Sequence, residues 1–329
     1  METAILAGMA RLGIPGLSAA IVRERELRWS SGYGLADVEN ELPATPATVY
    51  RLASVSKPIT AIAVLQLVER GRLDLDSPIQ RYVPSFPEKP WPITVRQLLA
   101  HQSGLRNWTD EEFHNTRRYT SVADALTPFK DDALLFEPGT KTQYTSLGFT
   151  LLGAALEGAG GAPFMEQLRT SVFQPAGMEQ ARDDDVFAIV PHRARGYQRR
   201  GDGSLANAPL TDTSNRVPGG GLVASAEDVA RFAAAVQRGV LLKPETMQMA
   251  LTPQKVRGGR TTGYGLGWVL GRRGTRREVY HVGGQPQVST VVYMLPDAGV
   301  AVAFLANLEG VENGLLDLAR QVAALAAAP

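Results

Sequence analysis

One short segment of the sequence, Ser54-Val55-Ser56-Lys57, contains the residue types of a nucleophile and its base. Positions three apart lie on one face of a helix, so Lys57 can reach the Ser54 hydroxyl. A serine hydroxyl needs a base to become a nucleophile, and a lysine kept neutral by burial can act as that base. A helix N-terminus would also favour developing negative charge. The same residues fit a bland alternative, in which Ser54 only caps a helix and Lys57 is solvated.

Two further segments offer groups that such a nucleophile would need. Tyr144 lies at a predicted loop-to-helix junction, where its phenol could exchange a proton with the nucleophile and protonate the leaving group. His281-Val282-Gly283-Gly284 ends a predicted strand, and its glycines allow the backbone to approach a ligand closely. A backbone N–H there, opposite the N–H of Ser54, would form an oxyanion hole.

The composition excludes several other classes of protein. None of the 329 residues is a cysteine, which rules out disulfides, thiolate nucleophiles and zinc–thiolate sites. No two of the four histidines have the spacing of a helical metal site, so we expect neither a metal nor a cofactor. The formal net charge of +1 argues against a nucleic-acid partner.

The sequence predicts no membrane span and leaves the compartment open. The apolar stretch 288–305 is interrupted by Pro296 and Asp297, and the stretch 147–156 is too short to cross a bilayer. The N-terminus has no basic region and predicts a short amphipathic helix instead of a signal peptide. The excess of 28 Arg over six Lys indicates a bacterial source. We expect a soluble protein, periplasmic or secreted if a signal peptide has been removed and cytoplasmic otherwise.

Hydrophobic patterns predict the elements that must position these groups. The apolar runs 17–22 and 27–33, separated by charged residues, predict a β-hairpin, and the apolar run 60–70 before Gly71 predicts a buried helix. Further helices are expected over 94–101, 149–157, 164–168, 226–238 and 315–328, strands over 265–270, 278–282, 289–295 and 300–306, and a polar loop over 183–216.

Strands at both ends of the chain, with helices between them, predict a sheet that joins the first hairpin to the C-terminal strands. The expected fold class is α+β, with an antiparallel sheet flanked by N- and C-terminal helices and an inserted, mostly helical domain. The sheet domain would be discontinuous, over residues 1–55 and 216–329, and the helical domain would span residues 56–215.

The motifs, in this order, resemble those of the serine β-lactamase and penicillin-binding-protein superfamily. The segments that follow the superfamily in order and spacing are 51–58, 98–105, 144–157, 219–232 and 264–268. The resemblance is to the branch of class C β-lactamases, S12 peptidases and family VIII carboxylesterases, and within it to the mitochondrial β-lactamase-like serine protease group. It implies a β-lactamase/transpeptidase-like fold.

The resemblance implies that Ser54 attacks a carbonyl carbon and forms an acyl-enzyme. Lys57 and Tyr144 would serve as general base and acid, in an order left open. The backbone N–H groups of Ser54 and Gly284 would hold the oxyanion. The other substrate-binding residues that it implies are His281, Gly283 and Ser146.

Two of these residues depart from the β-lactamase pattern: Ser146 replaces an amide side chain and His281 replaces a lysine. A short hydroxyl reaches less far than an amide. An imidazole with an ordinary pKa of about 6.5 is mostly neutral at pH 7 and would hold a β-lactam carboxylate less firmly. We therefore favour peptide or ester substrates, and expect activity to rise on modest acidification if protonated His281 binds an anionic substrate.

The expected function is a serine hydrolase acting on a peptide (amide) or carboxylic ester bond of a small-molecule or peptide substrate. Two alternatives stay open. One is a β-lactamase or D,D-carboxypeptidase-type penicillin-binding protein, and the other is a non-catalytic scaffold of the same fold. A homo-oligomer is compatible with the resemblance, although no segment identifies an interface.

Overall fold

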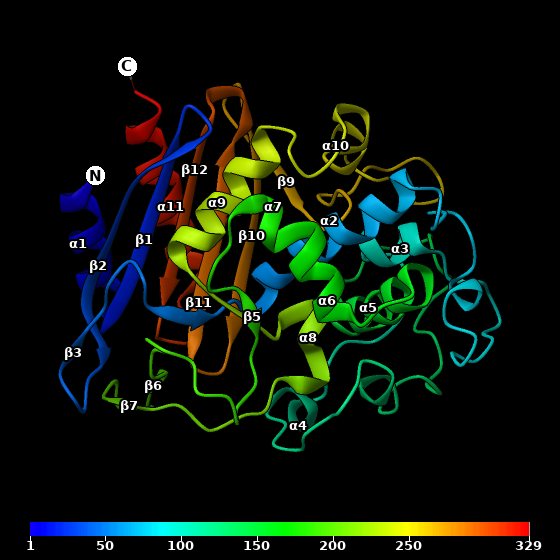
Figure 1. Cartoon of the computed structure of the whole chain (residues 1–329), viewed down its shortest axis with the longest axis horizontal. Helices are drawn as coiled ribbons and strands as arrows, with labels where there is room; N and C mark the ends of the chain where they lie inside the picture. Colours follow the sequence, from blue (N-terminus) through cyan, green and yellow to red (C-terminus); the bar gives the residue numbers. More distant parts are fainter. Residues whose placement is uncertain (329) are drawn as a thin grey trace.

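A seven-stranded antiparallel sheet is the largest element of the computed structural model, which describes residues 1–328. The strand order is β3-β2-β1-β12-β11-β10-β9 (Figure 1). The first hairpin therefore joins the C-terminal strands, as the sequence predicts. The strands are β1 (Gly16–Arg23), β2 (Glu26–Asp37), β3 (Leu42–Pro43), β9 (Val269–Arg273), β10 (Arg276–Gln285), β11 (Val288–Leu295) and β12 (Val300–Ala306).

Helices cover both faces of this sheet (Figure 1). On one face, α1 (Glu2–Leu12) and α11 (Glu312–Ala326) pack against the sheet, and on the other lies α9 (Ala226–Gln237). Along β12, alternate residues belong to the two cores: Val302 and Phe304 face α11, whereas Ala301 and Ala303 face α9. Because both faces of this strand are buried, its sequence is apolar throughout instead of alternating.

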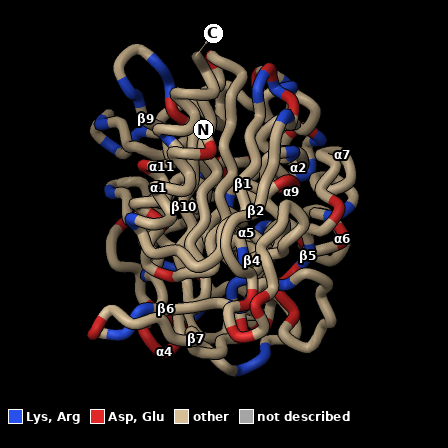
Figure 2. The backbone as a smooth tube through the Cα atoms, turned by 90° about the vertical axis from the view of Figure 1, so that its left-hand side faces the viewer, with Lys and Arg blue, Asp and Glu red and all other residues tan. Residues whose placement is uncertain are grey.

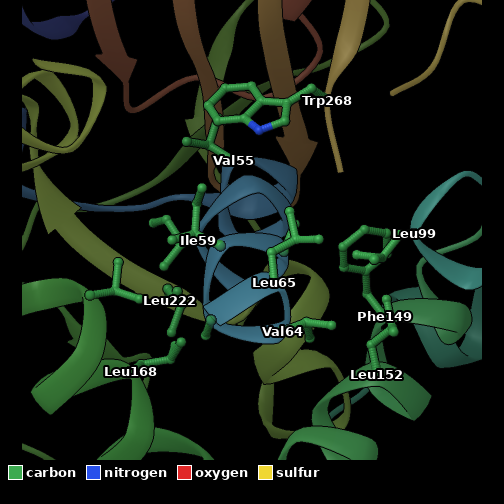
Figure 3. Packing of buried hydrophobic residues seen from close by; sticks show 14 of the residues in the cluster. Val55, Ile59, Val64, Leu65, Leu99, Phe149, Leu152, Leu168, Leu222 and Trp268 are labelled. Carbon is green, nitrogen blue, oxygen red and sulfur yellow. The ribbon is translucent and has the colours of Figure 1, made fainter. Parts of the chain in front are cut away.

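A helical layer built around α2 (Ser56–Glu69) lies beside the sheet and α9 (Figure 1). Its residues are buried from Ser56 to Leu67, which explains why the segment is apolar on every side. In Figure 3, Ile59, Val64 and Leu65 of α2 point into surrounding side chains from other elements. The labelled neighbours are Leu99, Phe149, Leu152, Leu168, Leu222 and Trp268.

The remaining elements are short or belong to this helical layer. The helices are α3 (Val95–Leu99), α4 (Asp110–Phe113), α5 (Leu147–Gly160), α6 (Phe164–Leu168), α7 (Gln174–Ala176), α8 (Val217–Gly220) and α10 (Pro244–Ala250). The 3₁₀ and π turns are η1 (Ala53–Val55), η2 (Ile79–Arg81), η3 (Asp124–Leu126), η4 (Arg169–Phe173), η5 (Ser214–Arg216) and η6 (Pro296–Ala298). A three-stranded sheet contains β4 (Val49–Arg51), β8 (Leu222–Ser225) and β5 (Arg182–Asp183). A two-stranded sheet contains β6 (Tyr197–Arg199) and β7 (Leu205–Asn207).

The predicted strand over 265–270 is mostly wrong. Residues 265–268 form a turn, and the strand begins only at Val269. Gly267 has φ +83° and its Cα faces α2 so closely that an added Cβ would lie 2.3 Å from Ala61 Cβ. The apolar character of this segment comes from packing on α2, where Trp268 is fully buried, and not from strand pairing. The predicted division into two domains stays a prediction.

Charged residues of both signs are interspersed along the loops visible in Figure 2. Several of them form surface ion pairs, such as Arg96 with Asp76 at 2.7 Å and Arg118 with Asp185 at 2.9 Å. Within residues 1–328, no helix has both the length and the apolar character needed to cross a bilayer.

Candidate active site

Ser54 lies in the short turn η1, between β4 and α2. The preceding residue, Ala53, has φ +47°, a left-handed conformation that is uncommon for a residue with a side chain. The turn is anchored by Leu52, whose N–H donates to Leu222 O at 2.8 Å. The chain therefore changes from strand to helix at Ser54, which is partly exposed next to the first turn of α2.

Lys57 occupies the first turn of α2 and is fully buried. Its Nζ donates to Gly219 O at 2.6 Å and lies 3.0 Å from both Ser54 Oγ and Ser146 Oγ. Burial, with a smaller contribution from the charge of Arg216, lowers the pKa of Lys57 well below its ordinary value. The protein thus favours the neutral amine, which has a lone pair to accept a proton.

Tyr144 is distant from Ser54 in sequence but contacts it in the fold. Its hydroxyl donates to Ser54 Oγ at 2.8 Å. Burial raises the pKa of Tyr144 above its ordinary value, so the phenol keeps its proton. The structure therefore brings Ser54, Lys57 and Tyr144 together around one oxygen atom.

His101 supports the loop that carries Tyr144. The two rings lie with their centroids 4.4 Å apart, and His101 Nδ1 accepts the N–H of Thr145 at 3.2 Å. Burial lowers the pKa of His101 well below its ordinary value, which keeps Nδ1 free of a second proton and able to accept. His101 thus helps to order the loop that carries Tyr144.

The third segment, at the end of β10, forms the opposite wall. A Cβ added to Gly283 would lie 2.6 Å from Leu52 O and 2.3 Å from Thr290 Oγ1, so only glycine lets β10 pass this close to the turn of Ser54. Gly284, the next residue, lines the same cavity as Ser54. This arrangement brings the backbone of residues 283 and 284 close to Ser54.

His281 lies behind this wall and is 2% exposed. Its Nδ1 donates to Val282 O at 2.7 Å, and its Nε2 has no hydrogen-bond partner among residues 1–328. Burial, with a smaller contribution from Lys57, lowers the pKa of His281 to about 3. The expectation that modest acidification protonates His281 for substrate binding is therefore wrong, because the imidazole stays neutral across that range.

A cavity of about 350 Å³ opens beside Ser54. Among the residues that sequence analysis singled out, Ser54, Tyr144, Ser146 and Gly284 line it, whereas Lys57, His281 and Gly283 lie outside its lining. The complete lining is Ser54, Asn107, Trp108, Thr109, Asp110, Phe113, Tyr144, Ser146, Arg216, Gly219, Gly220, Gly284 and Gln285.

Several lining residues were missed from the sequence. Asn107 accepts the N–H of Ser146 at 2.9 Å and so positions the Ser146 hydroxyl near Lys57. Arg216 was placed at the end of a polar loop, although its position just before the glycine segment 219–221 was a usable signal. Trp108 and Phe113 gave no signal, because the segment around the short helix α4 has no regular spacing of apolar residues.

The structure combines a large antiparallel sheet with a helical layer. A serine, a lysine and a tyrosine are in contact where the two meet, beside a glycine-lined strand. This combination is typical of proteins that transfer acyl groups through serine. The chain belongs to the beta-lactamase family, whose model matches residues 1–327. The resemblance predicted from the sequence is thereby confirmed, together with the α+β fold class. This membership indicates serine hydrolase or acyl-transferase chemistry in general.

Individual relatives agree with this family. The human mitochondrial serine beta-lactamase-like protein LACTB is 27% identical over 420 residues, covering 95% of this chain and 76% of the relative. Penicillin-binding protein 4* of Bacillus subtilis (strain 168) is 29% identical over 300 residues, covering 86% of this chain and 66% of the relative. The solved octameric penicillin-binding protein homologue from Pyrococcus abyssi has a TM-score of 0.84 at 25% identity, covering 98% of this chain and 76% of that one.

Proposed function

We propose that this protein is a serine hydrolase that cleaves a peptide (amide) or carboxylic ester bond through an acyl-enzyme on Ser54. The observation that carries the proposal is the pair of contacts at Ser54 Oγ, with Lys57 Nζ at 3.0 Å and Tyr144 OH at 2.8 Å, at the edge of a cavity. A nucleophile, a base and an acid within hydrogen-bonding distance meet the geometric requirement for covalent catalysis.

The opposite pKa shifts support an order for the proton transfers in acylation. Neutral Lys57 accepts the Ser54 proton while its own N–H groups donate to Gly219 O and Ser146 Oγ. Ser54 Oγ attacks the carbonyl carbon, and the N–H groups of Ser54 and Gly284 stabilise the oxyanion. Tyr144 then gives its proton to the leaving group and recovers one from Lys57, so the two groups titrate as a coupled pair.

Deacylation repeats these steps with water in place of Ser54 as the attacking group. Water loses its proton to the same base, attacks the ester carbonyl, and Ser54 regains its proton as the acid product leaves.

Two features support a peptide or ester substrate over a β-lactam. Ser146 offers a short hydroxyl, and the buried, neutral His281 supplies no fixed positive charge for a β-lactam carboxylate. Penicillin binding is a second candidate because the similarity to Penicillin-binding protein 4* covers 86% of this chain. Nitrocefin turnover, or a stable benzylpenicillin adduct in the intact mass, would favour this candidate.

The decisive experiment is the intact mass of the protein after reaction with a fluorophosphonate. We expect one adduct on the parent chain and none on Ser54→Ala, because Ser54 Oγ contacts both the Lys57 amine and the Tyr144 hydroxyl at the edge of the cavity. Ser56→Ala is the matched control and should keep the adduct. Absence of labelling in the folded parent would contradict the proposal and favour a non-catalytic scaffold. A peptide library read by mass spectrometry, beside a panel of esters, then separates peptidase from esterase.

A further inference from the structure

A second cavity, of about 470 Å³, lies apart from the candidate active site. Its walls include parts of β4 and β8, the end of β7 and the loops 184–196 and 208–212, near β6 and β7 in Figure 1. Within residues 1–328, it shares no lining residue with the cavity beside Ser54. Its volume is typical of cavities that bind small molecules, so it has room for a ligand of its own.

Large apolar side chains that are exposed to solvent form part of the lining. Phe187 is 78% exposed and Leu210 is 85% exposed, and Val186 is also exposed. These side chains come from two different loops, yet they converge on one cavity. Exposed apolar side chains gathered around a cavity commonly mark a ligand-binding site. The apolar part of a ligand can cover them here.

Four arginines also line this cavity, and three of them pair with separate carboxylates. The three pairs are Arg51 with Asp184 at 2.7 Å, Arg118 with Asp185 at 2.9 Å and Arg195 with Glu39 at 3.2 Å. The fourth, Arg193, lies 3.5 Å from Asp184, the carboxylate that already pairs with Arg51. The positive charge of Arg193 is therefore incompletely balanced.

Arg193 also has a donor without an acceptor. Its Nη2 donates to the backbone oxygen of Asp185 at 2.9 Å, whereas its Nε is buried and has no hydrogen-bond partner among the described residues. A buried N–H group without an acceptor is unfavourable, and a carboxylate is a strong acceptor for a guanidinium. An anionic group in the cavity would thus satisfy both the charge and the donor.

Two aspartates in the lining limit the charge that such a ligand can carry. Asp184 is buried between Arg51 and Arg193, and Asp212 accepts the N–H of Ser214 at 2.8 Å without a listed arginine partner in residues 1–328. A group with a single negative charge matches the one incompletely balanced guanidinium. A dianion would meet stronger repulsion from Asp212.

We propose that this second cavity binds a small amphiphilic carboxylate, such as a medium-chain fatty acid. The carboxylate accepts from Arg193, and the apolar chain covers Phe187 and Leu210. The inference does not depend on the proposed acyl-enzyme chemistry, because the two cavities have separate linings within the described residues.

The test uses two fluorescent probes with the same apolar body. 1-Anilinonaphthalene-8-sulfonate carries a single negative charge, and N-phenyl-1-naphthylamine is its neutral counterpart. In the parent protein we expect the charged probe to bind at a single site, about tenfold or more tightly than the neutral probe, because a charge-assisted hydrogen bond is stronger than a neutral one. Decanoate should displace the charged probe. Equal affinity for the two probes, or no displacement by decanoate, overturns the inference.

Four variants locate the bound probe. Arg193→Gln should weaken binding of the charged probe by about tenfold and leave the neutral probe nearly unchanged. Phe187→Ser should weaken both probes by about tenfold, because each covers this ring with its apolar body. Ile189→Ser is the matched control, at a 95% exposed residue of the same loop that does not line the cavity, and should change neither affinity. Trp108→Ser, in the cavity beside Ser54, should also change neither.

The outcomes separate this cavity from the active site. A probe that is weakened by Trp108→Ser and not by Phe187→Ser lies beside Ser54, which overturns the inference, as does an unchanged affinity for the charged probe in folded Arg193→Gln. If Arg193→Gln does not fold, Leu210→Ser, which should weaken both probes, and the ratio of the two affinities in the parent decide the outcome. Absence of fluorophosphonate labelling at Ser54 would overturn the proposed function and leave these results unaffected.

Discussion

At the scale of single residues, the protein shifts an amine and a phenol in opposite directions by the same means. Burial makes the charged form unfavourable for both groups, which lowers the pKa of Lys57 and raises the pKa of Tyr144. The result is a neutral amine and a neutral phenol in contact with Ser54 Oγ, as the proposed base and acid require. The geometry of the site and its protonation state therefore have one common cause.

The pH dependence of acylation should show this pairing. With a neutral ester, we expect kcat/KM to rise with pH through the lowered pKa of Lys57, because only the neutral amine accepts the Ser54 proton. The rate should then stay level until Tyr144 loses its proton, above its ordinary range. A rate that falls as pH increases from about 5.5 to 8 would contradict this prediction, since His281, with a pKa of about 3, does not titrate there.

The same burial predicts that Lys57 destabilises the fold. Its pKa is lower in the folded than in the unfolded chain, so the unfolded chain binds more protons between the two values and stability rises with pH there. Lys57→Met should therefore stabilise the protein by about 1–4 kcal/mol at neutral pH, with the gain shrinking as pH approaches the unfolded value. Thermal unfolding at several pH values measures this effect.

The control for this variant is Lys141→Met, at an exposed lysine. It should leave the melting temperature nearly unchanged at every pH. A lower melting temperature for Lys57→Met at pH 7 would show that the hydrogen bond to Gly219 O outweighs the penalty of burying the amine.

At the scale of elements, the proposed oxyanion site depends on the close approach of β10 to the turn of Ser54. Gly283→Ala would place a Cβ 2.6 Å from Leu52 O and must push the strand away from η1. We expect acylation to slow by about 100-fold, because a displacement near 1 Å at a catalytic site has effects of this size. The rate of fluorophosphonate labelling measures the loss.

The control for this substitution is Gly201→Ala, at an exposed turn where an added Cβ meets nothing within 4 Å. It should label at the parent rate. Equal labelling of the Gly283 and Gly201 variants would contradict the role given to the close approach of β10.

The elements also show what the sequence could and could not predict. α2 was predicted because a helix buried on all sides is apolar along its whole length. The β1–β2 hairpin was predicted because a charged turn separates its two apolar runs. Residues 265–268 were predicted as strand because apolar residues that pack on α2 look the same in sequence as strand residues. Ser54, Lys57 and Tyr144 were predicted from short motifs. Arg216 and Gln285, which also line the cavity, were missed because their place beside Ser54 depends on contacts between distant parts of the chain.

At the scale of the whole molecule, one hydrophobic core connects the sheet to the helical layer. It includes Ala20 and Ala303 from the sheet together with Leu152 and Leu168 from the helices. We therefore expect a single unfolding transition in denaturant, with tryptophan fluorescence and far-UV circular dichroism changing together. Two separated transitions would contradict this expectation and would favour independent folding of residues 56–215.

The position of β1 between β2 and β12 has a further consequence for the order in which the strands can pair during folding. An N-terminal strand must wait for the last strand to be synthesised, and partners so distant in the chain pair slowly. Both chain ends lie at one corner in Figure 1, where α1 contacts α11. A circular permutant, closed there by a linker and reopened at the exposed turn around Gly201, would make these strands near neighbours in sequence and should refold faster than the natural order.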